Sequence, residues 1–474
     1  MLFNASERME KVSKRNFVSC EIPNITEISN ALVMPMERVP RPPVGKWQPA
    51  LYKLGVYESE NLKFVESSKH LRNYDLAFLD KLIAVGDKYS KEELENVESN
   101  ECFKVGVYGG IIFDHFGHFL IETLARLWYV VENNYKGRII FYEEGKAMSR
   151  PYINDIFNLL GIKEQIYIIR KPIMVERLYI PEQSMFYQHS AKNCFLLPYM
   201  HLFNVTEKML SSKVEQHKKI YLSRNKIKGR GEIFGEDKLE LFFKENGYAV
   251  IYPEKLSMEE QIYLVGSAEN VAGINGSALH LLLFNLNSPT VTNIIRNDWV
   301  NANFFMFDQL LGNHVNYIFA GKNRIDTSAT NGPFEIDLTV INDSFWKIGL
   351  RNGNELLKLD TKSSIQERID FLCNWRSQQT STLHLKLTEE ERMFRYMELI
   401  LLNPKNLDNW VSLIKFCMHY RRYIEATAFS CKLIRIDTEE KYLPEYKKWA
   451  KELQDAGQLD EYRDIIGLLK KSNT

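Results

Sequence analysis

The sequence lacks the features that mark a membrane-spanning or a nucleic-acid-binding protein. No stretch of its 474 residues approaches the roughly 20 consecutive apolar residues that a membrane-spanning helix needs. Positive and negative side chains balance, with 61 Lys and Arg against 61 Asp and Glu. No global field therefore draws the chain to nucleic acid or to anionic lipid, and any basic site must be local.

Cysteine is scarce, and its spacing excludes the usual cysteine-based sites. The six cysteines are widely separated and form no C-x-x-C pair, which argues against a zinc site and against a disulfide framework. Residues 1–30 mix charges of both signs and contain no apolar signal segment. We therefore expect a cytoplasmic protein, with peripheral association at the inner face of the cytoplasmic membrane as its nearest approach to lipid.

Several catalytic signatures are also missing. No Asp-x-Asp occurs, which disfavours the class of transferase that holds a phosphorylated donor through a divalent cation. The chain has neither the G-x-G-x-x-G dinucleotide motif nor a P-loop, and it has no G-x-S-x-G elbow. We expect no cofactor and no essential metal.

The middle of the chain alternates strand and helix patterns in two blocks, which is typical of doubly wound α/β sheets. In the first block the expected strands are 103–108, 138–142, 165–169 and 177–181, and the expected helices are 118–130 and 152–160. In the second block the expected strands are 219–223, 249–252, 270–273 and 289–295, and helices begin near 237, 257 and 278. Ser257 and Glu260 have the spacing of a helix capping box.

The two flanks of this alternating region have a different character. Residues 1–100 look irregular, with a proline-punctuated extended arm before Trp47 and a charged loop over 91–100. From about Thr388 the pattern is helical, and Asn403–Trp410 resembles the start of a tetratricopeptide helix pair.

These patterns predict an α/β fold with a helical extension. We expect two Rossmann-like domains that face each other, over residues 1–208 and 209–385, with the ligand cleft between them. The third domain, over 386–474, is predicted to be tetratricopeptide-like and to serve a protein partner or self-association.

The first group of candidate catalytic residues follows the strand at 103–108. His118, Glu122 and Arg126 are spaced four apart, so a regular helix would place them in one polar stripe on a largely apolar helix. One interpretation is structural, with a Glu122–Arg126 pair inside the helix. The functional interpretation makes Glu122 or His118 a general base, with Asp114 as a weaker candidate on the same wall.

A second group combines a hydroxyl with cations just after a strand, where doubly wound sheets present loops to ligand. Ser223 ends the strand predicted over 219–223, Arg224 follows it directly, and Arg230 lies in the basic stretch after them. These side chains are suited to bind a diphosphate. A solvated basic loop is the alternative.

The third group lies where the strand at 270–273 turns into a helix. Asn275, Gly276, Ser277 and Ala278 are small, so backbone N–H groups at the helix start can approach a phosphate closely. His280 follows on the same helix. Such turns also occur where glycine is needed only to reverse the chain.

Taken in order, these segments resemble glycosyltransferase family 61. The family's G-H-aromatic-x-x-acid-x-L-x-R-L stretch matches residues 117–127, and its Y-x-S-R strand end matches 221–224. Its Ser-x-x-x-Gln helix start matches 257–261, and its G-x-x-G-[AS]-x-L turn matches 273–279. This sequence departs from the family pattern at three positions, with Glu122 where Asp is common, Ala125 where Pro is frequent and Asn275 where His is frequent.

The resemblance implies a GT-B-like glycosyltransferase that inverts the anomeric centre without an essential metal. A nucleotide-sugar donor, expected to be UDP-linked, would bind Ser223, Arg224, Arg230 and residues 275–278. The expected catalytic residues are Glu122, His118 and Asp114. Three further residues are expected to support the site: Arg126, Gln261 and His280.

The expected acceptor is a saccharide or a lipid-linked glycan in capsule, lipopolysaccharide or exopolysaccharide synthesis, in association with membrane-bound glycan machinery. Two alternatives belong to other classes. One is transfer of a different group, such as phosphate or pyruvate, onto polysaccharide. The other is a non-catalytic interaction protein that works through its helical tail.

Overall fold

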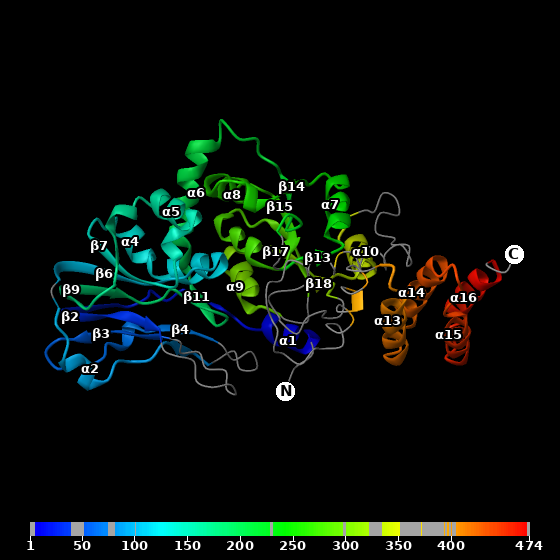
Figure 1. Cartoon of the computed structure of the whole chain (residues 1–474). Coiled ribbons are helices and arrows are strands. Elements are labelled where there is room, and N and C mark those ends of the chain that lie inside the picture. The colour runs from blue at the N-terminus through cyan, green and yellow to red at the C-terminus, as the bar shows by residue number, and fades with distance from the viewer. Residues whose placement is uncertain are drawn as a thin grey trace. The chain divides into compact units, whose positions relative to one another are not determined.

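The computed structural model describes residues 5–38, 52–73, 81–99, 101–227, 231–296, 300–321, 334–350 and 404–471, together with the isolated positions 371, 393, 396, 397 and 400. It is a mixed α/β structure with several sheets (Figure 1). The chain divides into two compact units. The first comprises residues 1–223 and 243–319, and the second comprises 224–242 and 320–474.

A six-stranded mixed sheet in the first unit has the order β3-β2-β9-β6-β7-β8. Strands β9, β6, β7 and β8 run parallel, whereas β2 lies antiparallel between β9 and β3. The strand bounds are β2 Ile25–Arg38, β3 Tyr52–Glu58, β6 Cys102–Ile112, β7 Arg138–Glu143, β8 Ile166–Ile168 and β9 Ile173–Pro181. The four strands predicted in this block are therefore confirmed.

The prediction that residues 1–100 are irregular is wrong for the segments that the structure describes. Strand β2 is long and is paired on both sides, although its sequence contains Pro35. Proline is tolerated there because it lies at the register shift between Met34 and Glu37, where no regular ladder bond is needed. The predicted charged loop over 91–100 instead contains the short helix α2 Lys91–Glu95, which Ser90 and Glu93 start with a capping box.

The second sheet of the first unit is fully parallel, with the order β14-β12-β15-β16-β17. Its bounds are β12 Lys219–Leu222, β14 Ala249–Ile251, β15 Asn270–Ile274, β16 Thr290–Ile295 and β17 His314–Phe319. In sequence order this is 2-1-3-4-5, so the chain reverses its direction of winding between β12 and β15. The strands predicted in this block are confirmed, and so is the capping box at Ser257.

One hydrophobic core in the first unit extends through helices and strands of both sheets. Helix α6 packs on α4, α5 and α8, and α8 packs on the 3-10 helix η8. Their bounds are α4 Trp128–Glu132, α5 Pro151–Leu159, α6 Leu197–Leu210, α8 Met258–Gly266 and η8 Ser277–Phe284. Leu120, Tyr199 and Leu283 are among the fully buried members of this core. The carboxyl ends of β6 and β15 are thus held on a shared, densely packed support.

The second unit contains a small parallel pair, β13 Ile233–Phe234 and β18 Phe334–Glu335, and helix α10 Leu338–Lys347. Its C-terminal part consists of two antiparallel helix pairs around a separate core (Figure 1). The helices are α13 Leu407–His419, α14 Tyr423–Ile436, α15 Leu443–Asp455 and α16 Leu459–Lys471. Paired helices were predicted for this region.

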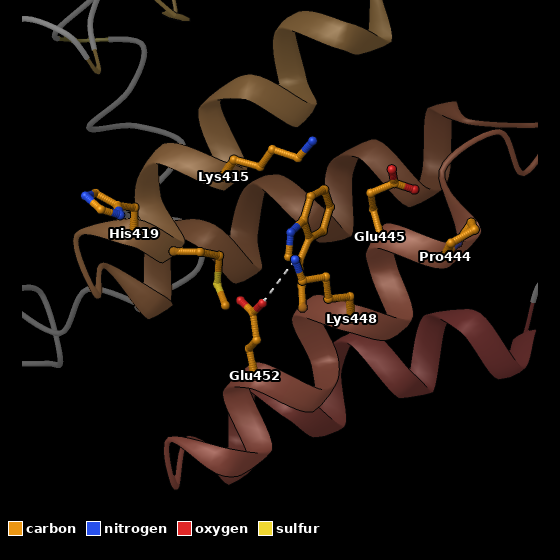
Figure 2. A pocket seen from close by; sticks show the side chains of 8 residues that line it. Lys415, His419, Pro444, Glu445, Lys448 and Glu452 are labelled. Carbon is orange, nitrogen blue, oxygen red and sulfur yellow. Dashed lines mark ion pairs between the residues drawn. The ribbon is translucent and has the colours of Figure 1, made fainter.

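A groove of about 430 Å³ lies between α13 and α15 (Figure 2). Met418 and Trp449 contribute apolar surface to its lining. Lys448 in the groove forms an ion pair with Glu452 at 3.8 Å. Lys415 and Glu445 add one charge of each sign, so the groove has no net charge that would select a partner.

Candidate active site

The segment after β6 is helical but not a regular α-helix. It consists of α3 Phe116–His118, the π-helical turn η2 Phe119–Thr123, the 3-10 turn η3 Leu124–Arg126 and then α4. The regular helix predicted over 118–130 is therefore wrong in its geometry. Tertiary hydrogen bonds compensate for the irregular ladder, because the Thr123 hydroxyl bonds back to β6 and Tyr199 donates to the carbonyl of Leu120.

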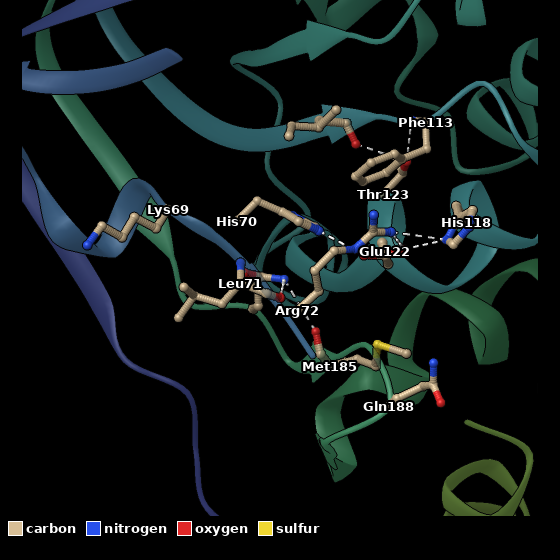
Figure 3. A network of polar contacts seen from close by, with 12 residues as sticks. Lys69, His70, Leu71, Arg72, Phe113, His118, Glu122, Thr123, Met185 and Gln188 are labelled. Carbon is tan, nitrogen blue, oxygen red and sulfur yellow. Dashed lines mark hydrogen bonds and ion pairs between the residues drawn. The ribbon is translucent and has the colours of Figure 1, made fainter. Parts of the chain in front are cut away.

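Glu122 lies in this π-helical turn, and its side chain is fully buried. Both of its oxygens bind side chains from two different parts of the chain (Figure 3). Oε2 accepts from Arg72 Nε at 2.8 Å and lies 3.0 Å from His70 Nε2. Oε1 accepts from Arg72 Nη2 and lies 2.6 Å from His118 Nδ1. The carboxylate is therefore contacted by one guanidinium and two imidazoles.

The protonation states follow from these contacts. Burial favours a neutral carboxyl, but Arg72 and the two histidines outweigh burial and hold the pKa of Glu122 well below its ordinary value of 4.5. Since a carboxylate oxygen only accepts, the contact at 2.6 Å requires a proton on Nδ1 of His118. In neutral His118 the lone pair then lies on Nε2. Burial lowers the pKa of His70, so His70 is neutral and donates from Nε2.

His70 and Arg72 were missed by the sequence analysis. They lie on β4 His70–Arg72, two residues apart and therefore on one face of the strand. The available signal was a His-x-Arg alternation in a region interpreted as irregular. A strand of three residues is too short to be recognised from the alternation of polar and apolar residues.

Arg126 does not pair with Glu122, so the structural interpretation of the polar stripe is wrong. The guanidinium donates to the carbonyls of Lys69 at 2.7 Å, Ser67 at 3.1 Å and Pro181. It is buried against the ring of Tyr108, and burial lowers the pKa of Arg126 to about 10. Arg126 thus braces the segment that leads into β4, which is a supporting role.

Asp114 lies apart from the contacts of Glu122. Its carboxylate pairs with Arg150, and both side chains are partly exposed, at 30% and 51%. Hydrogen bonds from Arg150 lower the pKa of Asp114. This is the geometry of a surface ion pair.

The predicted donor-binding residues of the second sheet gather where its winding reverses. Ser223 follows β12 and Asn275 follows β15, and these two strands are neighbours in register. Backbone bonds from Ser223 to Ile251 and from Asn275 to Ile294, both 2.8 Å, continue the ladders beyond the strands. Gly276, Ser277 and Ala278 are half-buried at the start of η8. In doubly wound sheets, ligands bind at such a reversal, outside the carboxyl ends of the strands.

Three other predicted residues have different surroundings. Arg224 belongs to the second unit, where its backbone N–H donates to Glu236 at 2.6 Å. Arg230 lies outside the described residues. The side-chain amide of Gln261 donates to the carbonyl of Leu256 at 3.1 Å, which stabilises the turn before α8.

Gly117 brings the two groups of candidate residues together within the first unit. A Cβ at this position would lie 2.8 Å from Nδ1 of His280 and 3.2 Å from Oγ of Ser277. Only glycine allows α3 to pack this closely on η8. His118 therefore lies one residue away from a direct contact with the turn that follows β15.

His280 is buried and stacks on Phe304, with ring centroids 5.2 Å apart. Within the described part of the chain, neither of its ring nitrogens has a hydrogen-bond partner. Burial lowers the pKa of His280 to about 3, so the ring is neutral.

No group of three or more His, Cys, Asp or Glu side chains suited to a metal ion occurs among the residues with described positions. In the same residues, no helix has the length and apolar character needed to cross a membrane. The cysteines whose positions are described are free thiols: Cys20, Cys102, Cys194, Cys417 and Cys431.

The comparison with protein families identifies the chemistry of this region. Residues 116–295 match the family model described as Glycosyltransferase 61. No curated protein matches the chain. The matched segment begins one residue before Gly117 and contains Glu122, Ser223 and the turn at 275–278, so it joins the ends of both sheets. Residues 116–295 therefore match glycosyltransferase family 61, and this match supports a glycosyltransferase enzyme.

Proposed function

We propose that the enzyme transfers a sugar from a nucleotide-sugar donor to a saccharide acceptor, with inversion at the anomeric carbon. The proposed nucleotide is UDP, and the proposed general base is His118. The observation that carries this proposal is the set of contacts around Glu122. All of its oxygen contacts are made by protein donors, and its side chain is fully buried. Glu122 therefore orients the base and does not itself meet the acceptor.

His118 meets the requirements of a base better than Glu122 does. A carboxylate whose pKa is held well below 4.5 is a weak base at neutral pH. The His118 side chain is 33% exposed, and the bond from Nδ1 to Glu122 directs the lone pair of Nε2 away from the carboxylate. This is the arrangement in which a buried carboxylate fixes the tautomer of a catalytic imidazole.

The proposed reaction is a single displacement. Nε2 of His118 takes the proton of the acceptor hydroxyl while its oxygen attacks the anomeric carbon of the donor. The bond between that carbon and the diphosphate oxygen breaks, and the nucleoside diphosphate leaves with the electron pair. Glu122 stabilises the imidazolium that forms, because its anionic oxygen lies 2.6 Å from Nδ1.

The donor is proposed to bind at the reversal of winding between β12 and β15. Ser223, Asn275, Gly276, Ser277 and Ala278 supply hydroxyl, amide and backbone donors there. Arg224 and Arg230 stay predicted donor-binding residues from the sequence. Since the chain has no Asp-x-Asp, we propose that protein groups and no essential metal ion meet the charge of the diphosphate.

Several broader features belong to the same proposal. The strand orders, with β8-β7-β6-β9 in one sheet and 2-1-3-4-5 in the other, support a GT-B-like pair of Rossmann-like domains. The helix pairs α13–α14 and α15–α16 support a tetratricopeptide-like tail that binds a protein. The widely spaced cysteines support a reducing, cytoplasmic location. A role in capsule, lipopolysaccharide or exopolysaccharide synthesis stays a prediction from the family resemblance.

The test compares wild-type protein with His118→Gln in the presence of EDTA. Wild-type protein should turn over a UDP-sugar, and UDP should raise its melting temperature because it binds the native state. His118→Gln should bind UDP equally well and lose about 10²- to 10⁴-fold in kcat, the usual contribution of a general base. A second histidine variant, His201→Gln on the surface of α6, serves as the control.

Each part of the proposal has its own contradicting result. Full turnover by His118→Gln would exclude His118 as the base. Activity lost in EDTA and restored by manganese would exclude the metal-independent mechanism. If neither UDP nor another nucleoside diphosphate shifts the melt at millimolar concentration, the donor class is wrong.

A further inference from the structure

Arg72 lies 44 residues before the family-matched segment begins, yet it contacts both Glu122 and His118 inside that segment. Its Nε and Nη2 bind different oxygens of Glu122, which is a bidentate geometry that only arginine provides. Nη2 also lies 3.1 Å from Nδ1 of His118. Since both of these nitrogens carry protons, they share Oε1 of Glu122 as their acceptor.

Two aromatic rings hold the guanidinium in place. Its central carbon lies 5.1 Å from the ring centroid of Phe113 and 5.1 Å from that of Tyr187. The same two rings contact the imidazole of His118, with centroid distances of 6.1 Å and 5.3 Å. The orientation of Arg72 and that of His118 are thus fixed by a common environment.

The backbone around Arg72 is held at each step by residues that are distant in sequence. Arg126 binds the carbonyl of Lys69 at 2.7 Å. The buried side chain of Gln183 accepts from the N–H of Leu71 at 2.6 Å and donates to its carbonyl at 3.3 Å. The N–H of Asn73 donates to the carbonyl of Tyr187 at 3.0 Å. A three-residue strand held in this way presents Arg72 in one position.

We propose that Arg72 is a positioning residue of the active site, and that β4 is therefore an integral part of the catalytic apparatus. Arg72 acts through Glu122: it keeps the carboxylate ionised and fixed, so that His118 carries its proton on Nδ1 and presents Nε2 to the acceptor. This inference rests on the proposed role of His118 as the base. It predicts an effect on turnover and none on donor binding.

The experiment uses the full chain with Arg72→Met and Arg72→Lys. Arg177→Met is the matched control, because Arg177 lies on β9 of the same unit with its side chain 57% exposed, and its partners Tyr179 and Glu27 are not among the contacts of Glu122. In Arg72→Met, kcat per folded molecule should fall about 10- to 100-fold, the effect of misplacing a reacting group by about 1 Å. Arg72→Lys keeps the charge but cannot bridge both oxygens of Glu122, so its kcat should lie between that of Arg72→Met and that of the Arg177→Met control. The UDP affinity of both variants should equal that of the control.

A double variant separates positioning from a general loss of structure. If Arg72 acts only through His118, adding Arg72→Met to His118→Gln should lower kcat little further, because residues that act as one unit are not additive. Should Arg72→Met fail to fold, Arg72→Lys and its double variant with His118→Gln carry the test.

The outcomes distinguish this inference from the proposed function. Arg72 variants with the kcat of Arg177→Met would overturn the positioning role, provided that His118→Gln is inactive. A UDP affinity that falls together with kcat would also overturn it, since Arg72 would then act on donor binding. An active His118→Gln overturns the proposed base whatever the Arg72 variants do.

Discussion

The carboxyl ends of β6 and β15 are both ends of strands that pair in parallel on each side, but the residues that follow them have opposite chemistry. After β6, ionisable side chains converge, and every oxygen contact of Glu122 involves a charged or imidazole donor. After β15, the residues are small and neutral, and His280 is buried with neither ring nitrogen bonded in the described part of the chain. The first end is suited to move a proton, and the second allows a ligand close to the backbone.

The difference shows two ways in which a buried ionisable side chain is accommodated. A buried carboxylate is tolerated only when its partners replace the water it has lost, and Glu122 has such partners on both oxygens. His280 avoids the same cost by staying neutral, with its pKa lowered to about 3. Gly117, where the two ends meet, has room for neither a charge nor a methyl group.

The largest expected effect follows from removing the charge of Glu122. Glu122→Gln leaves Arg72 buried without its anion and turns one accepting oxygen into a donor, so we expect a loss of about 3–5 kcal/mol in the free energy of unfolding. Asp114→Asn is the matched control, because its ion pair with Arg150 is partly exposed to solvent and should add little to the stability. Denaturant unfolding of both variants measures the difference. Equal stabilities would contradict the contrast between the two carboxylates.

The same variant has a pH signature. The folded pKa of Glu122 lies below its ordinary value of 4.5, so its stabilising contribution is complete above pH 4.5 and is lost as pH falls further toward the folded pKa. The stability difference between wild type and Glu122→Gln should therefore shrink below pH 4.5. A stability difference that does not change with pH would mean that Arg72 and the two histidines do not stabilise the ionised form of Glu122.

The sequence predicts the parallel strands and the contact between His118 and Glu122, but it does not predict the contacts of Arg126. The parallel strands could be predicted, because buried runs such as 219–223 and 270–273 are bounded by turn residues. The contact of His118 with Glu122 follows from their spacing, and it is found at 2.6 Å. Arg126 breaks the pattern because the helix changes from a π-helical to a 3-10 turn between Glu122 and Arg126, which alters the rotation per residue.

The partners of Glu122 from β4 could not be predicted for a different reason. His70 and Arg72 reach the carboxylate across about 50 residues, and β4 is held by long-range bonds from Arg126 and Gln183. No local periodicity encodes such contacts. The family resemblance did not help either, because the matched segment begins at residue 116.

A smaller effect is expected where the two ends touch. In Gly117→Ala, the new methyl group would lie 2.8–2.9 Å from ring atoms of His280, and this ring is held by its stack on Phe304. We expect a loss of about 1–3 kcal/mol, as for other overpacked cores. Combining Gly117→Ala with His280→Ala removes the ring and should recover part of this loss, which a double-mutant cycle measures. If the stability losses of the two single variants add up to that of the double variant, the residue at 117 and the ring of His280 do not interact.

The smallest effect at neutral pH is expected for His280→Phe, and its value lies in its pH dependence. Neither ring nitrogen is bonded within the described part of the chain, so the phenyl ring forfeits no hydrogen bond and keeps the stack on Phe304. The pKa of His280 is lowered from 6.5 to about 3. Between these two pH values His280 is protonated in the unfolded chain and neutral in the folded protein, so the free energy of unfolding falls as pH drops from 6.5 toward 3.

Relative to wild type, His280→Phe should therefore gain about 2 kcal/mol between pH 7 and pH 5, from the 1.36 kcal/mol that each pH unit contributes in this window. His70, whose pKa is also lowered, contributes in the same direction but is present in both proteins and cancels in the difference. The comparison across pH also cancels any packing cost of the larger ring. If the difference between the two proteins is flat from pH 7 to pH 5, His280 is not held neutral in the folded state. It would then have an acceptor at the end of β15, and the contrast between the two sheet ends would be smaller than the described contacts indicate.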